Sequence, residues 1–424
     1  MITALLFGVF LTVIFLGVPI AFGLMLGSTA VVLAQDSSLL LVAQRFFTSN
    51  DSFPFMAIPF FMLAGEVMTA GGASKRLVEM AGVFVGWITG GLAMVVTLTG
   101  MFFASLSGSS AATTAAIGGV LIPAMEQKGY DRDFTAAIVA AAGTTGIVIP
   151  PSITMVVFGV ATQTSITKLF VGGILPGILM GVSMMAVTYF RAKKRNYAGE
   201  PSKGTAENIR IMTDGLWALL MPIIILGGIY SGVFTATESA VVAVVYGLCI
   251  GLFIYKELKL KDMPKVILKA VTGSAVVMII MNSAGLFGWI LTADMIPQKI
   301  AYAIEAFTTN KYLIMILVNI FLLFVGTFLN ASAAVVILAP ILLPILSNIG
   351  YDPVFVGVIM VVNMAIGCIT PPVGVDLFVA QTISGVSIMR ITKAILPLMS
   401  ILILNLFILI FFPQIVLFLP SFMG

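Results

Sequence analysis

Two copies of one pattern of helix-breaking residues lie 221 residues apart in this chain. The first copy holds Pro123, Gly129-Tyr130-Asp131, Phe134, Gly146 and Pro150-Pro151, and the second holds Pro344, Gly350-Tyr351-Asp352, Phe355, Gly367 and Pro371-Pro372. Because every position keeps the same offset without a gap, the pattern indicates an internal duplication. Both copies lie in apolar sequence, where unwound backbone is tolerated only if it is buried in protein or lines a polar cavity.

The composition is that of a membrane protein. Of the 424 residues, 60% are hydrophobic and 9% are charged, and the mean hydropathy is +1.17. Apolar runs recur from residues 5–20 to residues 395–412, and roughly a dozen crossings of about 20 residues would fit. We therefore predict an all-α polytopic membrane protein in a lipid bilayer. The net charge of +4 does not indicate nucleic-acid binding, because the basic residues lie at the edges of apolar segments.

The distribution of basic residues predicts how the two copies are oriented. Basic loops at about 191–210 and 256–269 are expected on the cytoplasmic side by the positive-inside rule. The tail from Phe412, which corresponds by offset to the first basic loop, has no lysine or arginine and is expected outside. Equivalent points thus fall on opposite sides, which predicts inverted repeats related by a two-fold axis in the membrane plane.

The duplication divides the chain into two repeats with the same predicted parts. Residues 1–212 form the first, with a re-entrant hairpin at about 88–123 and a proline-broken helix at about 134–160. Residues 213–424 form the second, with a hairpin at about 312–344 and a broken helix at about 355–382. The polar stretch at about 192–212 joins them.

Small and hydroxyl-bearing residues gather before the proline in each copy. Residues 103–114 read FASLSGSSAATT, and their counterparts at 324–335 read FVGTFLNASAAV. By offset, Ser105 matches Gly326 and Ser109 matches Asn330. Close helix packing through small residues is an alternative explanation, since it is common in membranes. The duplicated breaks favour a binding site instead.

Each copy then continues into a glycine followed by two prolines, which should open the helix. Proline lacks a backbone donor, and the residue before it avoids helical geometry. Freed carbonyl groups and nearby hydroxyl groups would offer oxygen ligands to a hard cation, while half-helix N-termini attract anions. Gly146 and its partner Gly367 mark these openings and are candidate Na⁺-site residues.

Acidic residues inside the apolar stretches are functional candidates by default. Of these, Glu238 is expected to cap a helix, and Asp376 lies just past the second break, where it is expected to meet solvent or substrate. The offset partner of Asp376 is Met155. The duplicated motifs hold none of these acids and the chain has no histidine, so Na⁺ coupling is favoured over H⁺ coupling, which stays the alternative.

These residues together resemble the large membrane subunit of the tripartite ATP-independent periplasmic (TRAP) transporters, the DctM-like proteins. The resemblance covers essentially the whole chain and rests on GVFTATESAVVAVVYGL at 232–248, FLNASAAVVILAPILLPI at 328–345, the two GYD triplets and the two proline pairs. It implies an elevator-type architecture of the ion-transporter superfamily in the bacterial cytoplasmic (inner) membrane. It also implies Na⁺ coupling through two or more sites, a small four-helix DctQ-like subunit and a periplasmic DctP-like binding protein.

The same resemblance implies where ions and substrate bind. Sodium sites would fall on Ser105, Gly143, Val148 and Pro150 in the first half and on Gly326, Gly367, Thr370 and Pro372 in the second. Substrate contacts would fall near Ser107, Ser109, Ser152 and Asn330. Many relatives look as if they carry Asp at the position of Asn330. The neutral amide of Asn330 removes a negative charge that would face an anionic substrate, and this changes which organic anion is expected. The pattern looks most similar to the sialic-acid (N-acetylneuraminate) branch, with C4-dicarboxylates and other sugar acids left open.

Other classes of protein fit the sequence less well. No nucleophile–base pair, metal set or phosphate loop is visible, so we do not expect an enzyme. A passive pore should line one continuous path with polar residues, whereas here they gather in two matched clusters. The nearest alternative is an inverted-repeat carrier that works alone, without a binding protein.

Overall fold

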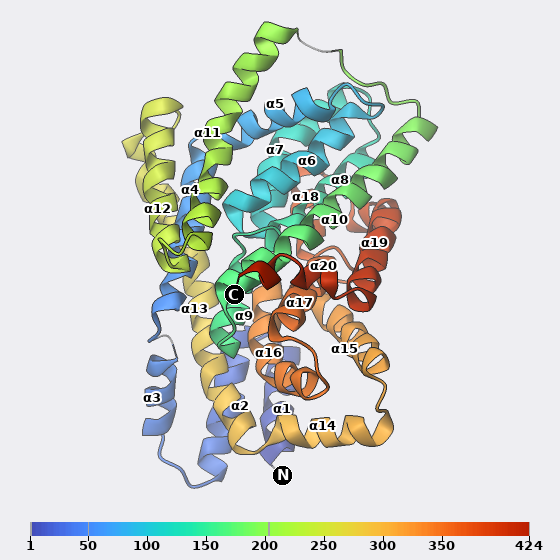
Figure 1. The fold of residues 1–424 in the computed structure, drawn as a ribbon. Helices are drawn as coiled ribbons and strands as arrows, with labels where there is room; N and C mark the ends of the chain where they lie inside the picture. The colour runs from blue at the N-terminus through green and yellow to red at the C-terminus, as the bar shows by residue number, and fades with distance from the viewer. Residues whose placement is uncertain (1, 50, 202–203, 424) are drawn as a thin grey trace.

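The computed structural model describes residues 2–49, 51–201 and 204–423, which fold into helices with no strand among them (Figure 1). The helices of the first half are α1 (Ile2–Phe15), α2 (Ile20–Ala34), α3 (Leu40–Thr48), η1 (Phe53–Met56), α4 (Ala57–Ala70), α5 (Ala73–Val85), α6 (Gly91–Ser107), α7 (Ser110–Gln127), α8 (Arg132–Gly143), η2 (Thr144–Ile147), α9 (Ile153–Thr162) and α10 (Ile166–Lys194). Those of the second half are α11 (Thr205–Tyr230), α12 (Ala236–Cys249), η3 (Ile250–Ile254), η4 (Leu260–Asp262), α13 (Met263–Ala293), α14 (Ile296–Phe307), α15 (Lys311–Gly326), α16 (Ala331–Asn348), α17 (Pro353–Gly367), α18 (Val375–Ser384), α19 (Ile388–Phe411), α20 (Gln414–Leu417) and η5 (Pro420–Phe422).

Among the residues that the structure describes, seven helical stretches are long and apolar enough to cross a membrane. They are η1 with α4, α10, α11, α12 with η3, η4 with α13, α16 and α19. Seven shorter apolar helices accompany them, namely α1, α2, α6, α9, α15, α17 and α18. A helix of 10–17 residues is shorter than the roughly 20 residues that a crossing needs. The apolar runs of the sequence are thus divided between full-length spans and shorter pieces.

The helix boundaries repeat at the same 221-residue offset as the sequence pattern. Helix α7 corresponds to α16 at both ends, and the starts of α8 and α17 correspond as well. In Figure 1, α6, α7 and α8 lie in the upper half of the molecule, whereas α15, α16 and α17 lie in the lower half. The helices run through Pro123 and Pro344, which lie inside α7 and α16, so each hairpin extends beyond the proline at which we expected it to end.

The two GYD triplets form the same turn before α8 and before α17. Gly129 and Gly350 have φ values of +77° and +93°, a backbone region that glycine enters without steric cost. Asp131 then accepts a hydrogen bond from the Phe134 N–H at 2.9 Å, and Asp352 accepts one from the Val354 N–H at 2.7 Å. Each aspartate thus caps its helix, which explains why the triplet marks a helix start.

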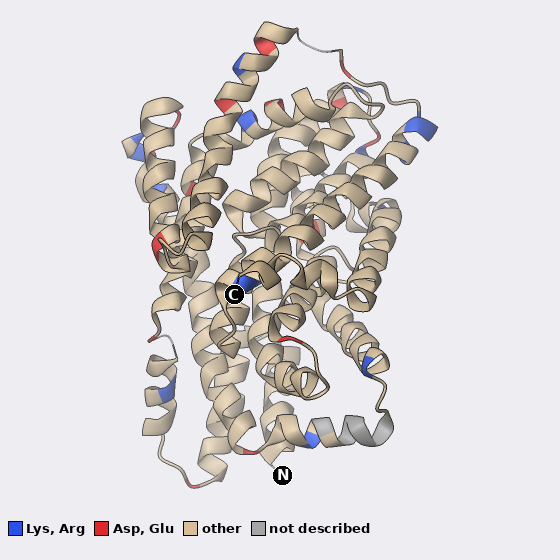
Figure 2. Cartoon of the chain, in the orientation of Figure 1, with Lys and Arg blue, Asp and Glu red and all other residues tan. Residues whose placement is uncertain are grey.

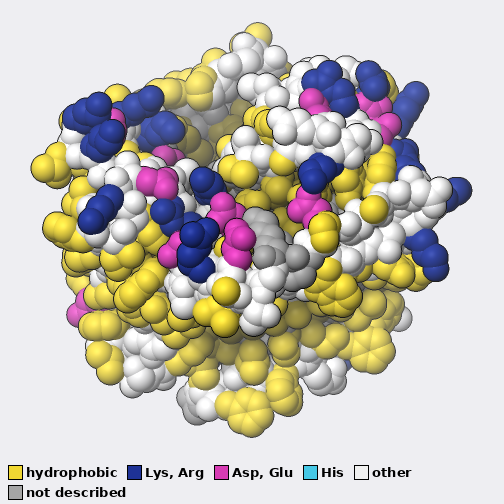
Figure 3. Space-filling view, turned by 90° about the horizontal axis from the view of Figure 1, so that it is seen from above, with side chains coloured by type: hydrophobic (Ala, Val, Ile, Leu, Met, Phe, Trp, Pro, Cys, Tyr) yellow, Lys and Arg dark blue, Asp and Glu magenta, His cyan; other side chains and the backbone are white. Residues whose placement is uncertain are grey.

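Charged side chains gather at one end of the molecule. Figure 2 shows most lysines and arginines in the upper half, and the view from above in Figure 3 shows them spread over that face with acidic residues among them. Ion pairs here join distant segments, such as Arg76 with Glu257 at 2.8 Å and Arg390 with Asp133 at 2.7 Å. The second pair links the start of α19 to the start of α8.

Candidate functional site

The first proline pair opens the chain between α8 and α9. Helix α8 ends at Gly143, the short helix η2 follows, and residues 148–152 are not helical before α9 begins at Ile153. The Pro150–Pro151 peptide bond is cis. Ser152 closes this opening, because its hydroxyl group donates to the Ile147 carbonyl at 2.5 Å and accepts from the Met155 N–H at 3.2 Å. The predicted interruption is therefore present.

The tip of the first hairpin packs directly against this opening. The Ile153 N–H donates to the Gly108 carbonyl at 3.2 Å. At the tip, the Thr113 hydroxyl group donates to the Ser109 carbonyl at 2.9 Å and lies 2.7 Å from the Ser107 hydroxyl group, from which it can accept. A methyl group added at Gly146 would lie 2.6 Å from that carbonyl oxygen, so glycine is needed for the approach. A hydroxyl-rich tip and an unwound helix thus share one buried surface.

The second half contains the same two parts in contact. Helix α17 ends at Gly367, residues 368–374 are not helical, and α18 begins at Val375; the Pro371–Pro372 bond is again cis. The Val373 N–H donates to the Thr327 carbonyl of the hairpin at 3.2 Å. A methyl group added at Gly367 would lie 2.8 Å from backbone atoms of Gly326, so the two main chains touch without a side chain between them.

The two halves also pack against each other beside the openings. Helix α9 of the first half packs against α16 of the second, and α18 of the second half packs against α7 and α8 of the first. The Thr154 and Ser332 hydroxyl groups lie 3.5 Å apart across the first of these contacts. Each broken helix therefore touches its own hairpin at the opening and the other half's hairpin beyond it.

The predicted sodium-site residues are placed in these two regions. Ser105 lies in α6 and donates to the Phe102 carbonyl at 2.6 Å, and Thr370 lies in the second opening and donates to the Ile366 carbonyl at 2.7 Å. Gly143, Gly146, Val148, Pro150, Gly326 and Gly367 are buried in the described structure, whereas Pro372 is exposed. The structure brings Gly326 and Gly367 into contact, and it brings Gly146 against Ser109.

The predicted substrate residues differ in how accessible they are. Ser107 and Ser152 are buried, Ser109 is half-buried, and Asn330 is exposed. Asn330 caps α16, since its side-chain oxygen accepts from the Ser332 N–H at 3.0 Å, and Ser109 caps α7. Asp376 is fully buried, so the expectation that it meets solvent is wrong for this structure. The predicted cap is confirmed at Glu238, which forms a capping box with Thr235.

Sequence reasoning did not assign Thr113, Thr114 or Thr327 to the sites. Thr113 bonds to Ser107 and Ser109, the carbonyl of Thr327 joins the second hairpin to its opening, and Thr114 lies against Gly143. A helical spacing of four residues from Ser109 to Thr113, and from Ser110 to Thr114, is the signal that could have identified the first two. Thr327 carries no such signal.

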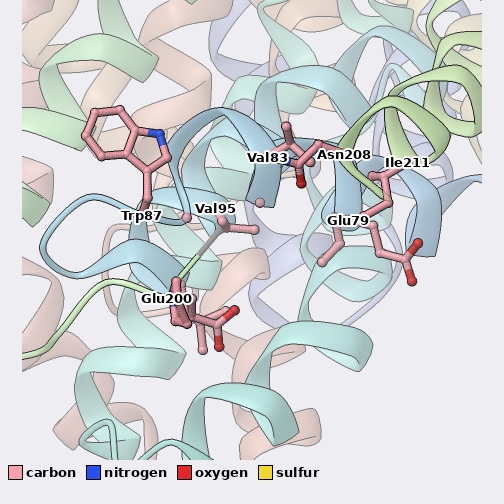
Figure 4. A pocket seen from close by; sticks show the side chains of 12 residues that line it. Glu79, Val83, Trp87, Val95, Glu200, Asn208 and Ile211 are labelled. Carbon is pink, nitrogen blue, oxygen red and sulfur yellow. The ribbon is translucent and has the colours of Figure 1, made fainter. Parts of the chain in front are cut away.

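A separate pocket lies at the charged end of the molecule. Figure 4 shows Glu79 of α5, Val95 of α6 and Asn208 and Ile211 of α11 around it, together with Trp87 and Glu200. None of its lining residues belongs to either opening. It is therefore not part of the candidate transport site.

Seven potential spans and two interrupted helices, each facing a hairpin, define a polytopic membrane transporter. The chain belongs to the family described as "Tripartite ATP-independent periplasmic transporter, DctM component", whose model matches residues 7–415. The predicted family is thereby confirmed.

Three relatives with assigned names are similar to nearly the whole chain. The isethionate TRAP transporter permease protein DctMQ of Oleidesulfovibrio alaskensis is 48% identical over 97% of this chain, which spans 65% of that relative's length. The C4-dicarboxylate TRAP transporter large permease protein DctM of Pseudomonas aeruginosa is 43% identical over 94% of this chain and 93% of its own. The sialic acid TRAP transporter large permease protein SiaM of Vibrio cholerae is 35% identical over 97% of this chain and 96% of its own.

A solved structure shares the fold. The Alcanivorax borkumensis YdaH transporter matches with a TM-score of 0.66 and 15% identity, covering 88% of this chain and 87% of its own. At this identity the likeness concerns the fold alone.

Proposed function

We propose that this chain is the large membrane subunit of a Na⁺-coupled importer for a small organic anion, located in the bacterial inner membrane. The observation that carries the proposal is that two interrupted helices each meet a hairpin tip bearing polar groups. Interrupted helices in two corresponding halves are typical of the binding sites of secondary transporters. A small four-helix subunit and a periplasmic binding protein would complete the system, as membership of the family suggests.

Cation binding is supported by the direction of the hydrogen bonds that the Ser105 and Thr370 hydroxyl groups make. Ser105 and Thr370 both donate their hydrogen atoms to helix carbonyl groups, which leaves oxygen lone pairs free for an ion. The non-helical segments 148–152 and 368–374 add backbone carbonyl groups nearby. Oxygen ligands of this kind suit hard cations such as Na⁺.

Anion binding is supported by three helix starts near the openings. Ser109, Ser152 and Asn330 cap α7, α9 and α16, and a helix N-terminus favours negative charge. Because Asn330 is neutral and exposed, it adds an amide donor without repelling an anion. These caps are the groups that we expect to face the substrate.

For the substrate, we place isethionate and C4-dicarboxylates first. The relatives with those names are 48% and 43% identical to this chain, compared with 35% for the relative named for sialic acid. Sialic acid, which the serine-rich tip and Asn330 suggested from sequence, stays the second candidate. For the movement, we propose an elevator in which the hairpins and broken helices of two inverted repeats carry the substrate past the remaining helices.

Transport should require Na⁺. The full chain, reconstituted in proteoliposomes with its small subunit, should accumulate isethionate or a C4-dicarboxylate from the loaded binding protein when Na⁺ is present outside. Replacing Na⁺ with K⁺ should reduce uptake to background, and collapsing the proton gradient should leave it intact. Uptake driven by a proton gradient without Na⁺ would contradict the coupling. Accumulation without the binding protein would instead support a carrier that works alone.

Removing the two hydroxyl ligands should weaken the Na⁺ dependence. In Ser105→Ala and Thr370→Val, the Na⁺ concentration for half-maximal uptake should rise by about fivefold or more, corresponding to the loss of one ligand worth about 1 kcal/mol. Ser28→Ala and Thr69→Val are matched controls, because both hydroxyl groups make the same kind of helix-carbonyl hydrogen bond in α2 and α4. Equal Na⁺ activation in the site variants and the controls would remove these residues from the sites.

A further inference from the structure

Asp376 is the only charged residue among the buried residues that the structure describes. None of its surface is exposed, and neither carboxylate oxygen has a hydrogen-bond partner. It lies in the first turn of α18, and its N–H donates to the Cys368 carbonyl at 3.0 Å. The backbone therefore holds this carboxylate in the protein interior, directly after the second opening.

The groups that face this carboxylate come from the other half of the chain. They are the hydroxyl groups of Ser110 and Thr114 on α7, and neither makes a hydrogen bond with it. The Thr114 hydroxyl has no partner of any kind, and it lies so close to Gly143 that no methyl group fits between them. Three unpartnered oxygen atoms thus meet where α7, the end of α8 and α18 pack together.

A buried carboxyl group without a partner either takes up a proton or stays ionised beside a bound cation. Buried charges are stable when they are paired or bind a metal ion, because burial removes the water that would otherwise solvate them. The start of α18 contributes only a partial positive charge. None of the ion pairs among the described residues includes Asp376. Carboxylate and hydroxyl oxygens are, however, suitable ligands for a hard cation.

We propose that Asp376, Ser110 and Thr114 form an additional site for one monovalent cation, Na⁺, at the contact between α18 and α7. A single carboxylate balances one positive charge, and no cluster of three acidic, cysteine or histidine residues exists among the described residues to hold a divalent ion. An anionic substrate would be repelled here. The inference rests on the proposed Na⁺ coupling and adds a site to it.

This site has no counterpart in the other half. The offset partner of Asp376 is Met155, whose side chain offers no charge to a cation. The two symmetric half-sites use carbonyl and hydroxyl groups, whereas this site uses a carboxylate. Because its ligands come from both halves, cation binding here would hold α18 against α7.

The number of Na⁺ ions bound tests the proposal directly. Radioactive ²²Na⁺ binding to the purified full chain, measured at equilibrium, should give one ion fewer in Asp376→Asn than in the wild type. Thr114→Val should keep the number of ions but weaken one class of site about tenfold. Thr188→Val is the matched control, because Thr188 of α10 is also fully buried and its hydroxyl has no partner. It should bind as the wild type does.

The outcomes separate this site from the proposed coupling. Equal numbers of bound ions and equal affinities in Asp376→Asn and the wild type would overturn the additional site and leave the symmetric half-sites in place. A wild type that binds no Na⁺ would overturn the coupling itself, and this site with it. If Asp376→Asn does not fold, Thr114→Val provides the test. A Na⁺ affinity equal to that of Thr188→Val would then overturn the additional site.

Discussion

Transport should be strongly reduced in Gly367→Ala. The added methyl group would lie 2.8 Å from three backbone atoms of Gly326, and main-chain atoms cannot move aside as a flexible side chain can. Overpacking of this kind typically costs about 1–3 kcal/mol. Because the strain falls on the contact between the second hairpin and its broken helix, we expect uptake to fall about tenfold or more. The midpoint of thermal unfolding should fall as well.

A glycine in open space provides the control for this substitution. Gly119 lies in α7 of the first hairpin, and no atom lies within 4 Å of a methyl group added there. Gly119→Ala should therefore leave uptake and thermal stability at wild-type values, or raise stability slightly through better helix propensity. If Gly367→Ala transports as well as Gly119→Ala, the close approach of the two main chains is not required for function.

The second large effect is expected from Asn330→Asp, which should weaken binding of the anionic substrate. Aspartate caps a helix as well as asparagine does, so α16 should keep its start. The change adds a negative charge beside the expected substrate position. Two charges about 4 Å apart interact by about 1 kcal/mol in water and about 4 kcal/mol near a protein surface. Since Asn330 is exposed, we expect the lower part of this range, a rise in KM of about tenfold.

Asn310→Asp separates this effect from a general change in charge. Asn310 caps α15, at the opposite end of the same hairpin from Asn330, and its side-chain oxygen accepts from the Tyr312 N–H at 3.0 Å. The substitution adds the same charge and keeps the same kind of cap. Uptake by this variant should match the wild type. Equal KM values in the two variants would place Asn330 away from the substrate.

The sequence predicted the helix breaks well because glycine and proline act locally. Helix α8 ends at Gly143 and α17 ends at Gly367, and the non-helical stretches at 148–152, after the short helix η2, and at 368–374 contain the two proline pairs. The hairpin ends were predicted less well. Proline inside a helix removes only one hydrogen bond, and α7 and α16 continue past Pro123 and Pro344, which are both exposed.

The surroundings of single side chains could not be predicted in the same way. Asp376 follows an exposed proline, Pro372, within four residues, and nothing in that local sequence indicates its complete burial. It is buried where α18 packs against α7 and α8, and the groups of α7 that face it, on Ser110 and Thr114, lie more than 260 residues earlier in the chain. Contacts of this range depend on how the two halves are placed together, which the periodicity within either half does not specify.

The exchange of contacts between the halves limits what one copy could do by itself. Helix α9 packs against α16, and α18 packs against α7, so each copy covers a surface that belongs to the other. A chain with a single copy would leave its side of these two contacts uncovered. It could bury those helix surfaces only by pairing with a second chain. Expressing the two halves as separate polypeptides should therefore yield a stable protein only when both are made in the same cell.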